Sequence, residues 1–156
     1  MKKLFTILTL AASIFATSNV SAASIESNDA NYAASQTLVQ ENPNRALLEM
    51  TADQMQSELP MDLGMGITMS KVYLTHSNFV LEIIAPNELI DLMRYGFQDM
   101  DRAEILESVA GDDATKLMLQ LCVSAECGFT MIYSDSTSKN QLKIAFSPAE
   151  LSTILK

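Results

Sequence analysis

The chain has 156 residues, 48% of them hydrophobic, and carries 19 acidic against 10 basic residues, for a formal charge of −9. This length is enough for one domain with a hydrophobic core. The negative charge argues against nucleic acid or an anionic membrane surface as a partner, because both repel an acidic surface. A basic protein partner is compatible with it, and so is a role of the charge in solubility alone.

The first 22 residues have the pattern of a secretory signal peptide. Lys2 and Lys3 form a positive start, residues 4–16 are apolar, and Val20-Ser21-Ala22 is a small-residue cleavage site. The apolar run is shorter than the roughly 20 residues that a spanning helix needs, so no membrane insertion is expected. No cysteine follows it, so no lipid attachment is expected either. Cleavage would remove both lysines, change the formal charge to about −11 and leave an exported protein beginning near Ala23.

A polar stretch rich in Ser, Asn and Ala follows at residues 23–43 and is predicted to be a flexible leader. The folded domain is expected over residues 44–156. Asn44 is predicted to cap a helix over Arg45–Glu58, which Pro60 ends. The apolar positions that indicate this helix recur at near-helical spacing: Leu47, Leu48, Met55 and Leu59, together with Thr51.

Two β-rich runs come next, at Ile67–Thr75 and Phe79–Ala85. Only the turn-forming residues 76–78 separate them, which predicts a β-hairpin. A flexible corner containing Gly64 and Gly66 precedes this hairpin. The second run is almost wholly apolar, so we expect a central strand with both faces covered.

Three helices are predicted after the hairpin. The first begins at Pro86-Asn87 and ends near Gly96, and the second is closed by Gly111. Negative side chains suit the positive end of the helix dipole. The acidic residues expected to cap the second and third helices are Asp99 or Asp101, and then Asp112 or Asp113.

The last part of the chain predicts a second hairpin and a terminal helix. The strands Gly128–Tyr133 and Gln141–Phe146 flank the polar loop 134–140. The segment Ser147-Pro148-Ala149-Glu150 has the pattern of a capping box and predicts a helix over residues 148–155. This order of elements indicates an α+β fold with a small antiparallel sheet built from two β-hairpins, packed with about four to five helices.

Few side chains in this sequence are suited to catalysis. The single histidine, His76, falls in a predicted turn, and no GxSxG, HExxH or phosphate-binding glycine loop occurs. The fragment Asp99-x-Asp101-x-x-Glu104 lacks the alternating ligands and the glycine of a calcium loop. A hydrolase using paired carboxylates is the enzymatic alternative. We expect no enzyme activity, with no catalytic residue, metal site or cofactor.

The two cysteines, Cys122 and Cys127, lie in a chain that is expected to be exported, which favours a disulfide between them. The loop that this disulfide would close is short, so its contribution to stability is only about 2 kcal/mol. A redox-active CxxC pair has two intervening residues, whereas four separate these cysteines. We therefore expect a structural disulfide rather than a redox centre.

Methionine is concentrated in the first part of the predicted domain, where Met61, Met65 and Met69 fall four residues apart. Thioethers are ligands that Cu(I) prefers, but the glycines between these residues disrupt a common face. We expect instead an apolar groove for a protein partner, since methionine adapts to varied surfaces. The residues predicted to line this groove are Met61, Met65, Met69, Leu89, Leu92 and Met93.

The segment LPMDLGMGITM at residues 59–69, with the apolar hairpin after it, resembles the LP-x-[acidic]-x-G-x-x-x-x-M segment of AspS-type pilotins of bacterial type II secretion. Looser matches are an apolar helix before Leu121-Cys122, a strand at residues 129–133 and Asn140-Gln141-Leu142. The resemblance implies a small periplasmic α+β protein, without enzymatic activity, that holds a short secretin segment. The chain departs from that family in lacking a lipidation cysteine and in the position of Cys127.

Two functions fit these features. The first is a non-catalytic periplasmic binding protein, a pilotin-like accessory factor of a secretion or envelope complex. The second is a periplasmic immunity protein that neutralises a secreted antibacterial toxin, because acidic inhibitors are steered onto basic active-site clefts. The expected partner is accordingly a protein, either a secretin-type segment or a basic toxin.

Overall fold

The computed structural model describes residues 42–155, so the predicted signal peptide and nearly all of the predicted leader lie outside the described residues. Within this range, no helix combines the length and the apolar character that crossing a membrane requires. The elements in chain order are α4 (Pro43–Ser57), β1 (Met61–Gly64), β2 (Ile67–Leu74), β3 (Asn78–Ile84), α5 (Asn87–Gln98), α6 (Arg102–Val109), α7 (Asp113–Ser124), β4 (Gly128–Ser134), β5 (Gln141–Phe146) and α8 (Pro148–Ile154).

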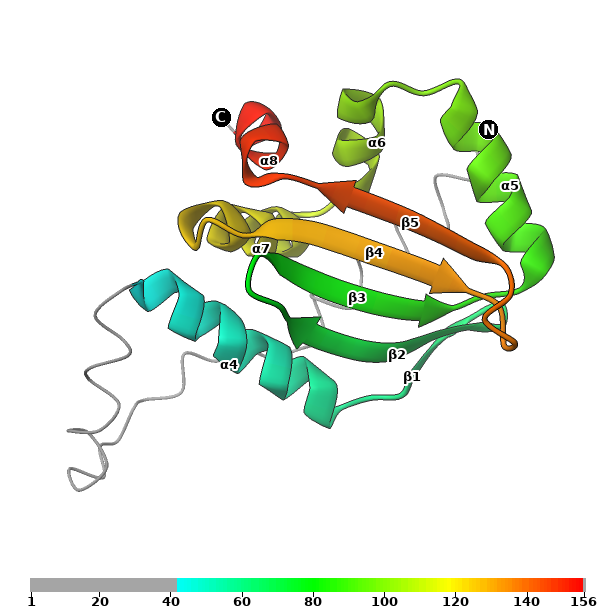
Figure 1. The fold of residues 1–156 in the computed structure, drawn as a ribbon, viewed down its shortest axis with the longest axis horizontal. Helices are drawn as coiled ribbons and strands as arrows, with labels where there is room; N and C mark the ends of the chain where they lie inside the picture. Colours follow the sequence, from blue (N-terminus) through cyan, green and yellow to red (C-terminus); the bar gives the residue numbers. More distant parts are fainter. Residues whose placement is uncertain (1–41, 156) are drawn as a thin grey trace.

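The five strands form one sheet in the order β1-β2-β3-β4-β5 (Figure 1). Both predicted hairpins are present, as β2–β3 and β4–β5, and the α+β class is confirmed. The two hairpins meet through β3 and β4, which run parallel. The expectation of a wholly antiparallel sheet is therefore wrong. The parallel pair arises because the chain leaves β3, passes through three helices and re-enters the sheet in the same direction.

The corner predicted before the first hairpin contains the additional short strand β1 and a tight turn into β2. Gly64, Met65 and Gly66 all have positive φ, at 83°, 56° and 76°. Glycine adopts this region without steric cost, which explains two of the three residues. A Cβ on Gly66 would also lie 3.2 Å from Cγ of Pro86, so this turn packs closely against the start of α5.

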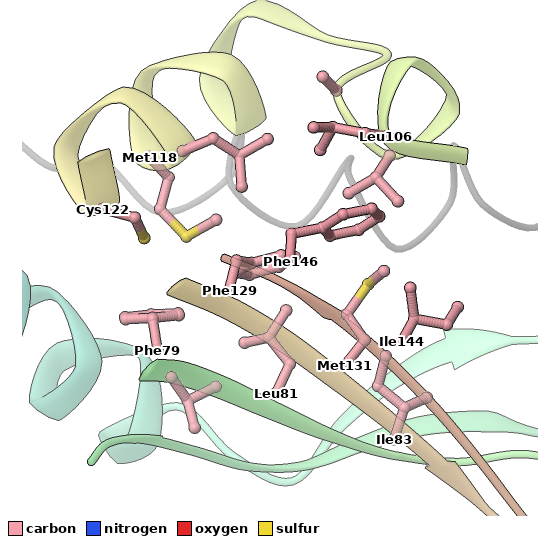
Figure 2. Close-up of a cluster of buried hydrophobic side chains, with 14 of the residues drawn as sticks. Phe79, Leu81, Ile83, Leu106, Met118, Cys122, Phe129, Met131, Ile144 and Phe146 are labelled. Carbon is pink, nitrogen blue, oxygen red and sulfur yellow. The ribbon is translucent and has the colours of Figure 1, made fainter. Parts of the chain in front are cut away.

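One face of the sheet forms the hydrophobic core together with the helices. Three neighbouring phenylalanines from β3, β4 and β5, Phe79, Phe129 and Phe146, are each at most 1% exposed. Figure 2 shows these side chains directed towards α6 and α7, which contribute Leu106, Met118 and Cys122. The strand side chains that alternate with the core residues therefore point to the opposite face.

This opposite face carries polar and charged side chains. Lys71 of β2, Glu82 of β3 and Lys143 of β5 follow one another across the sheet by register, with only Ile132 between the last two. Oε2 of Glu82 lies 3.4 Å from Nζ of Lys71, and its Oε1 accepts a hydrogen bond of 2.9 Å from the hydroxyl of Tyr73. Lys71, Tyr73 and Lys143 are exposed, so the helices cover only one face of the sheet.

Helix starts follow the predicted capping chemistry closely. Asp101 and Ser147 each form a complete capping box, with Glu104 and Glu150 respectively, and Asp112 caps α7. The prediction that Asn44 caps the first helix is wrong. Asn42 caps it instead, by accepting hydrogen bonds from two backbone N–H groups, because Pro43 occupies the first helical position that its fixed φ favours.

Helix α5 is longer than predicted and continues past Gly96 to Gln98. One buried face, with Ile90 and Met93, holds α5 against the domain. A single glycine weakens a helix by only about 1 kcal/mol, which burial of this face offsets.

The outer edge of β5 is occupied by two arginines. Arg94 of α5 donates a hydrogen bond of 3.0 Å to the carbonyl oxygen of Gln141, and Arg102 of α6 donates to the carbonyl oxygen of Ala145. The Arg102 guanidinium also lies 4.7 Å from the ring centroid of Phe146. Charged side chains placed on an edge in this way oppose pairing with another strand.

Glu150 links this edge to the acid stability of the fold. A hydrogen bond of 2.8 Å from Nε of Arg102, and further hydrogen bonds from Ser147, lower the pKa of the Glu150 carboxyl from 4.5 to about 2. A carboxylate with a lowered pKa stabilises the fold above its unfolded-state pKa, and this stabilisation is lost as the pH falls from about 4.5 towards 2. We expect Glu150→Gln to flatten the decline of unfolding free energy over that interval, as measured by urea denaturation. Glu107→Gln, an exposed change on α6, should retain the wild-type decline; equal slopes for Glu150→Gln and wild type would contradict the assignment.

Candidate functional site

The structure does not place the six predicted groove residues on one surface. Met69 and Met93 are fully buried, at 0% exposure, and belong to the core. Met61 and Leu89 are partly buried and pack against that core. The two that reach the surface are Met65, in the β1–β2 turn, and Leu92, on the outer face of α5.

Two of the methionines are brought together by strand pairing. Met61 of β1 lies directly opposite Met69 of β2 in the antiparallel register. Met65 lies in the turn between these strands and is 71% exposed. The spacing of four along the chain therefore reflects a strand, a turn and a strand. Adaptable packing around the β1–β2 corner accounts for Met61 and Met69.

The two cysteines meet at the C-terminal end of α7. The helix ends in a Schellman motif, in which the N–H of Cys127 donates to the carbonyl of Cys122 at 2.8 Å and the N–H of Glu126 donates to the carbonyl of Val123 at 3.0 Å. Glu126 has the left-handed φ of 56° that this motif requires. The motif brings together the side chains at its two ends, which here are Cys122 and Cys127.

Both cysteines are free and buried in the structure. Burial raises the pKa of the Cys122 thiol to about 12. Burial also raises the pKa of Cys127, although Nη1 of Arg45 lies 3.3 Å from its sulfur and opposes that shift. Both thiols are therefore protonated near neutral pH, which makes them poor nucleophiles.

We expect the pair to form the predicted disulfide when the protein is oxidised. Intact-mass measurement after unfolding without reductant should show the loss of two hydrogens, with no free thiol. Reduction should then lower the unfolding free energy by about 2 kcal/mol, because the closed loop is short. A matched Cys122→Ser, Cys127→Ser variant should show no response to reductant. Two titratable thiols in the oxidised, unfolded protein would contradict the pairing.

The remaining chemically reactive side chains have structural roles or lie apart. His76 is exposed in the β2–β3 turn, where its carbonyl accepts a hydrogen bond of 2.8 Å from Nη1 of Arg45. Asp101 and Glu104, part of the calcium-like fragment, hydrogen-bond each other's backbone in the α6 capping box. Within residues 42–155, no cluster of three His, Cys, Asp or Glu side chains is arranged to hold a metal ion.

A surface groove of about 730 Å³ lies between α4 and the outer edge of β2. Its helical side carries Glu49, Asp53 and Gln56, and its strand side is formed by residues 70–74. Figure 1 shows α4 lying beside β2, on the side of the sheet opposite to β5. We call this feature the α4–β2 groove.

Two contacts from α4 fix the position of this groove. Near the start of the helix, Nη2 of Arg45 donates to the carbonyl oxygen of Thr75 at 2.8 Å. Near its end, Oε1 of Gln56 accepts a hydrogen bond of 2.9 Å from the N–H of Val72. The buried face of α4, with Leu48, holds the helix against the core, so its polar face lines the groove.

The α4–β2 groove was not among the sites predicted from the amino-acid sequence. One signal was present, because Glu49, Asp53 and Gln56 recur at spacings of four and three, as residues on one helix face do. The partner surface, however, is the edge of β2. That edge is open only because β1 is shorter than β2, and β1 was not predicted.

No protein-family model matches this chain, and no curated protein matches it. A crystal structure of a protein from Pseudomonas aeruginosa, described as secreted, aligns with a TM-score of 0.53 and 13% identity, over 70% of this chain and 93% of that one. The type 2 secretion pilotin EpsS of Vibrio vulnificus aligns with a TM-score of 0.46 and 9% identity, over 70% and 92% of the two chains. The type II secretion pilotin AspS of Vibrio cholerae gives 0.46 and 9%, over 69% and 92%.

Proposed function

We propose that this chain is a non-catalytic binding protein of the bacterial periplasm, a pilotin-like accessory factor that holds a segment of a secretin-type protein. The observation that supports this most directly is the α4–β2 groove, where a helix and an incompletely paired strand leave a surface site open. The resemblance of residues 59–69 to the pilotin segment supports the same class of function. That segment forms β1 and the turn that leads into β2.

The placement of the reactive side chains supports binding rather than catalysis. Asp101, Glu104 and Asp112 are engaged in helix caps. Cys122 and Cys127 are both buried, and either the expected disulfide or the raised pKa values of the reduced thiols leave no nucleophilic thiolate. In this proposal the protein acts by the shape and charge of its surface. The exposed Met65 and Leu92 remain candidates for secondary contacts outside the groove.

The test uses the secretin encoded in the same genome. Isothermal titration of the purified chain, without its predicted signal peptide, against overlapping peptides that span that secretin should show saturable one-to-one binding to one segment. Deletion of the gene should lower the amount of assembled secretin multimer in the outer membrane. Absence of binding together with an unchanged multimer would overturn the proposal.

The immunity function predicts a different result from the same strain. An immunity protein protects the cell against a delivered toxin and leaves secretin assembly unaffected. Coexpression of the chain with exported toxins of basic surface should restore growth if this function applies, because opposite charges steer such pairs together. Growth protection with normal secretin assembly would therefore replace the accessory function with the immunity function.

A further inference from the structure

The two edges of the sheet differ in what occupies them. At β5, Arg94 and Arg102 donate to outward-facing carbonyls. At β2, strand β1 pairs with the first half only, and its register ends where Met61 meets Met69. The second half of β2, Ser70–Leu74, therefore has a strand neighbour on one side alone, which is β3.

The unpaired edge of Ser70–Leu74, which we call the half-edge, directs its backbone groups towards the α4–β2 groove. Thr75 donates its N–H to the carbonyl of Asn78 across the β2–β3 turn at 2.8 Å. Because outward and inward groups alternate along an antiparallel strand, the N–H and C=O of Leu74 and of Val72 point away from β3. The hydrogen bond from the N–H of Val72 to Oε1 of Gln56 confirms that direction for Val72.

Gln56 is the one side chain of α4 seen to bond this half-edge among the described residues. It is exposed and uncharged, and a side-chain amide is readily replaced by a backbone carbonyl, which offers the same acceptor. The arginines at β5, by contrast, carry charge and make several contacts each. An incoming strand thus meets a weaker barrier at β2 than at β5.

The groove is acidic on its helical side. Glu49 lies 3.6 Å from Nε of Arg45, while Asp53 takes part in no ion pair among residues 42–155. The groove's one basic side chain, Lys71, is already paired with Glu82 on the open face of the sheet. An occupant that carries lysine or arginine would therefore meet unneutralised negative charge in the groove.

We propose that Ser70–Leu74 accepts an extended, basic segment of a partner protein as an added β-strand, which displaces the side chain of Gln56 from Val72. Main-chain hydrogen bonds to Val72 and Leu74 supply the pairing, and alternate basic side chains face Glu49 and Asp53. This inference rests on the proposed function, and it specifies the conformation and charge of the bound segment.

Two other occupants fit less well. Residues 23–41 of this chain contain acidic residues but no lysine or arginine, so their charge does not complement the groove. A second copy would place like-charged acidic surfaces against each other, given the formal charge of −9. A basic segment from another protein is the occupant that the charge distribution favours.

The probe is a synthetic eight-residue peptide of alternating lysine and valine, with blocked termini, titrated into the purified chain without its predicted signal peptide. We expect saturable binding, with the amide of Leu74 protected from hydrogen exchange and the side-chain amide signals of Gln56 shifted in NMR spectra. A peptide with glutamate in place of lysine should not bind. A lysine peptide with alternate backbone nitrogens methylated keeps its charge but cannot pair, and should bind at least about tenfold more weakly.

Matched charge reversals locate the site. Asp53→Lys should weaken binding of the lysine peptide by about tenfold, whereas Glu107→Lys, the same change on exposed α6, should alter it less than about twofold. Equal effects of the two variants, or equal binding of the methylated peptide, would show non-specific charge attraction and overturn the inference. A concentration-dependent dimer that protects Leu74 without peptide would overturn it in favour of a second copy.

The same variants separate this inference from the proposed function. If the secretin segment binds wild type and Asp53→Lys equally and leaves the Leu74 amide unprotected, the strand-addition site is wrong and the accessory function stands. If the lysine peptide binds as described, but the secretin segment does not bind and deletion of the gene leaves the secretin multimer unchanged, the strand-addition site stands and the accessory function is wrong.

Discussion

Replacing Phe129 with alanine is expected to lower the free energy of unfolding by about 3 to 5 kcal/mol, the range for truncating a buried phenylalanine. Phe129 lies in β4, an interior strand between β3 and β5, is 1% exposed, and packs against Phe79 with ring centroids 6.3 Å apart and planes 19° apart. Its register partner on the other side is Phe146. The truncation therefore opens a cavity in the middle of the phenylalanine row that α6 and α7 cover (Figure 2).

Urea denaturation followed by far-UV circular dichroism measures this loss, since the chain has no tryptophan to report by fluorescence. Tyr95→Ala is the matched control, because Tyr95 is an aromatic residue on α5 that is 71% exposed. The control should change the unfolding free energy by less than about 0.5 kcal/mol. A cost below about 1 kcal/mol for Phe129→Ala would show that the phenylalanine row is not the centre of the core.

Replacing Gly128 with alanine is expected to destabilise the protein by about 1 to 3 kcal/mol, the usual range for overpacking. A Cβ at this position would lie 2.5 Å from the carbonyl oxygen of Phe146 and 2.5 Å from Oδ1 of Asn78. The Asn78 side chain can rotate away, but the Phe146 oxygen belongs to the backbone of β5. The substitution therefore separates the start of β4 from the end of β5.

Gly111→Ala provides the control for Gly128→Ala in the same urea denaturation experiment. A Cβ on Gly111 would approach only the carbonyl oxygen of Ser108, at an ordinary contact distance of 3.4 Å. We expect a change of less than about 0.5 kcal/mol for this control. Equal stability of the two variants would contradict the close approach of β5 to Gly128.

Much of the local structure was predictable because short-range chemistry determines it. Ser147 and Glu150 form the predicted capping box, and Asp101 forms another with Glu104. The segment Gln141–Phe146 forms a strand over the predicted residues. In each case the decisive contacts join residues within a few positions of one another.

The arrangement of the strands depends on distant contacts and was not predictable in full. The apolar run that became β3 indicated a central strand, which is confirmed, but the expectation that both of its faces are covered is wrong, because the helices cover one face only and Ile84 is exposed. Periodicity does not reveal which strand lies on each side, so the parallel partner β4 was missed. Strand β1 was missed because its four residues, ending in Gly64, carry little β-propensity of their own.

The same limit applies to the binding surface. The burial of Met69 depends on which face of β2 meets the core, and the burial of Met93 depends on which face of α5 does. The structure buries both side chains in the core. The α4–β2 groove combines residues 49–56 with residues 70–74. It exists because the pairing of β2 with β1 stops at Met69, one position before this half of β2 begins. Helix spacing alone reveals only the acidic side of such a site.

The arginines at β5 also limit the size of any assembly. Polymers that grow by strand addition, including amyloid, need two competent edges on every subunit, one to receive and one to donate. Because Arg94 and Arg102 donate to two backbone carbonyls of β5, an incoming strand would have to displace both arginines at that edge. We therefore expect growth by strand addition to be disfavoured at β5, so that complexes formed at β2 remain limited in size.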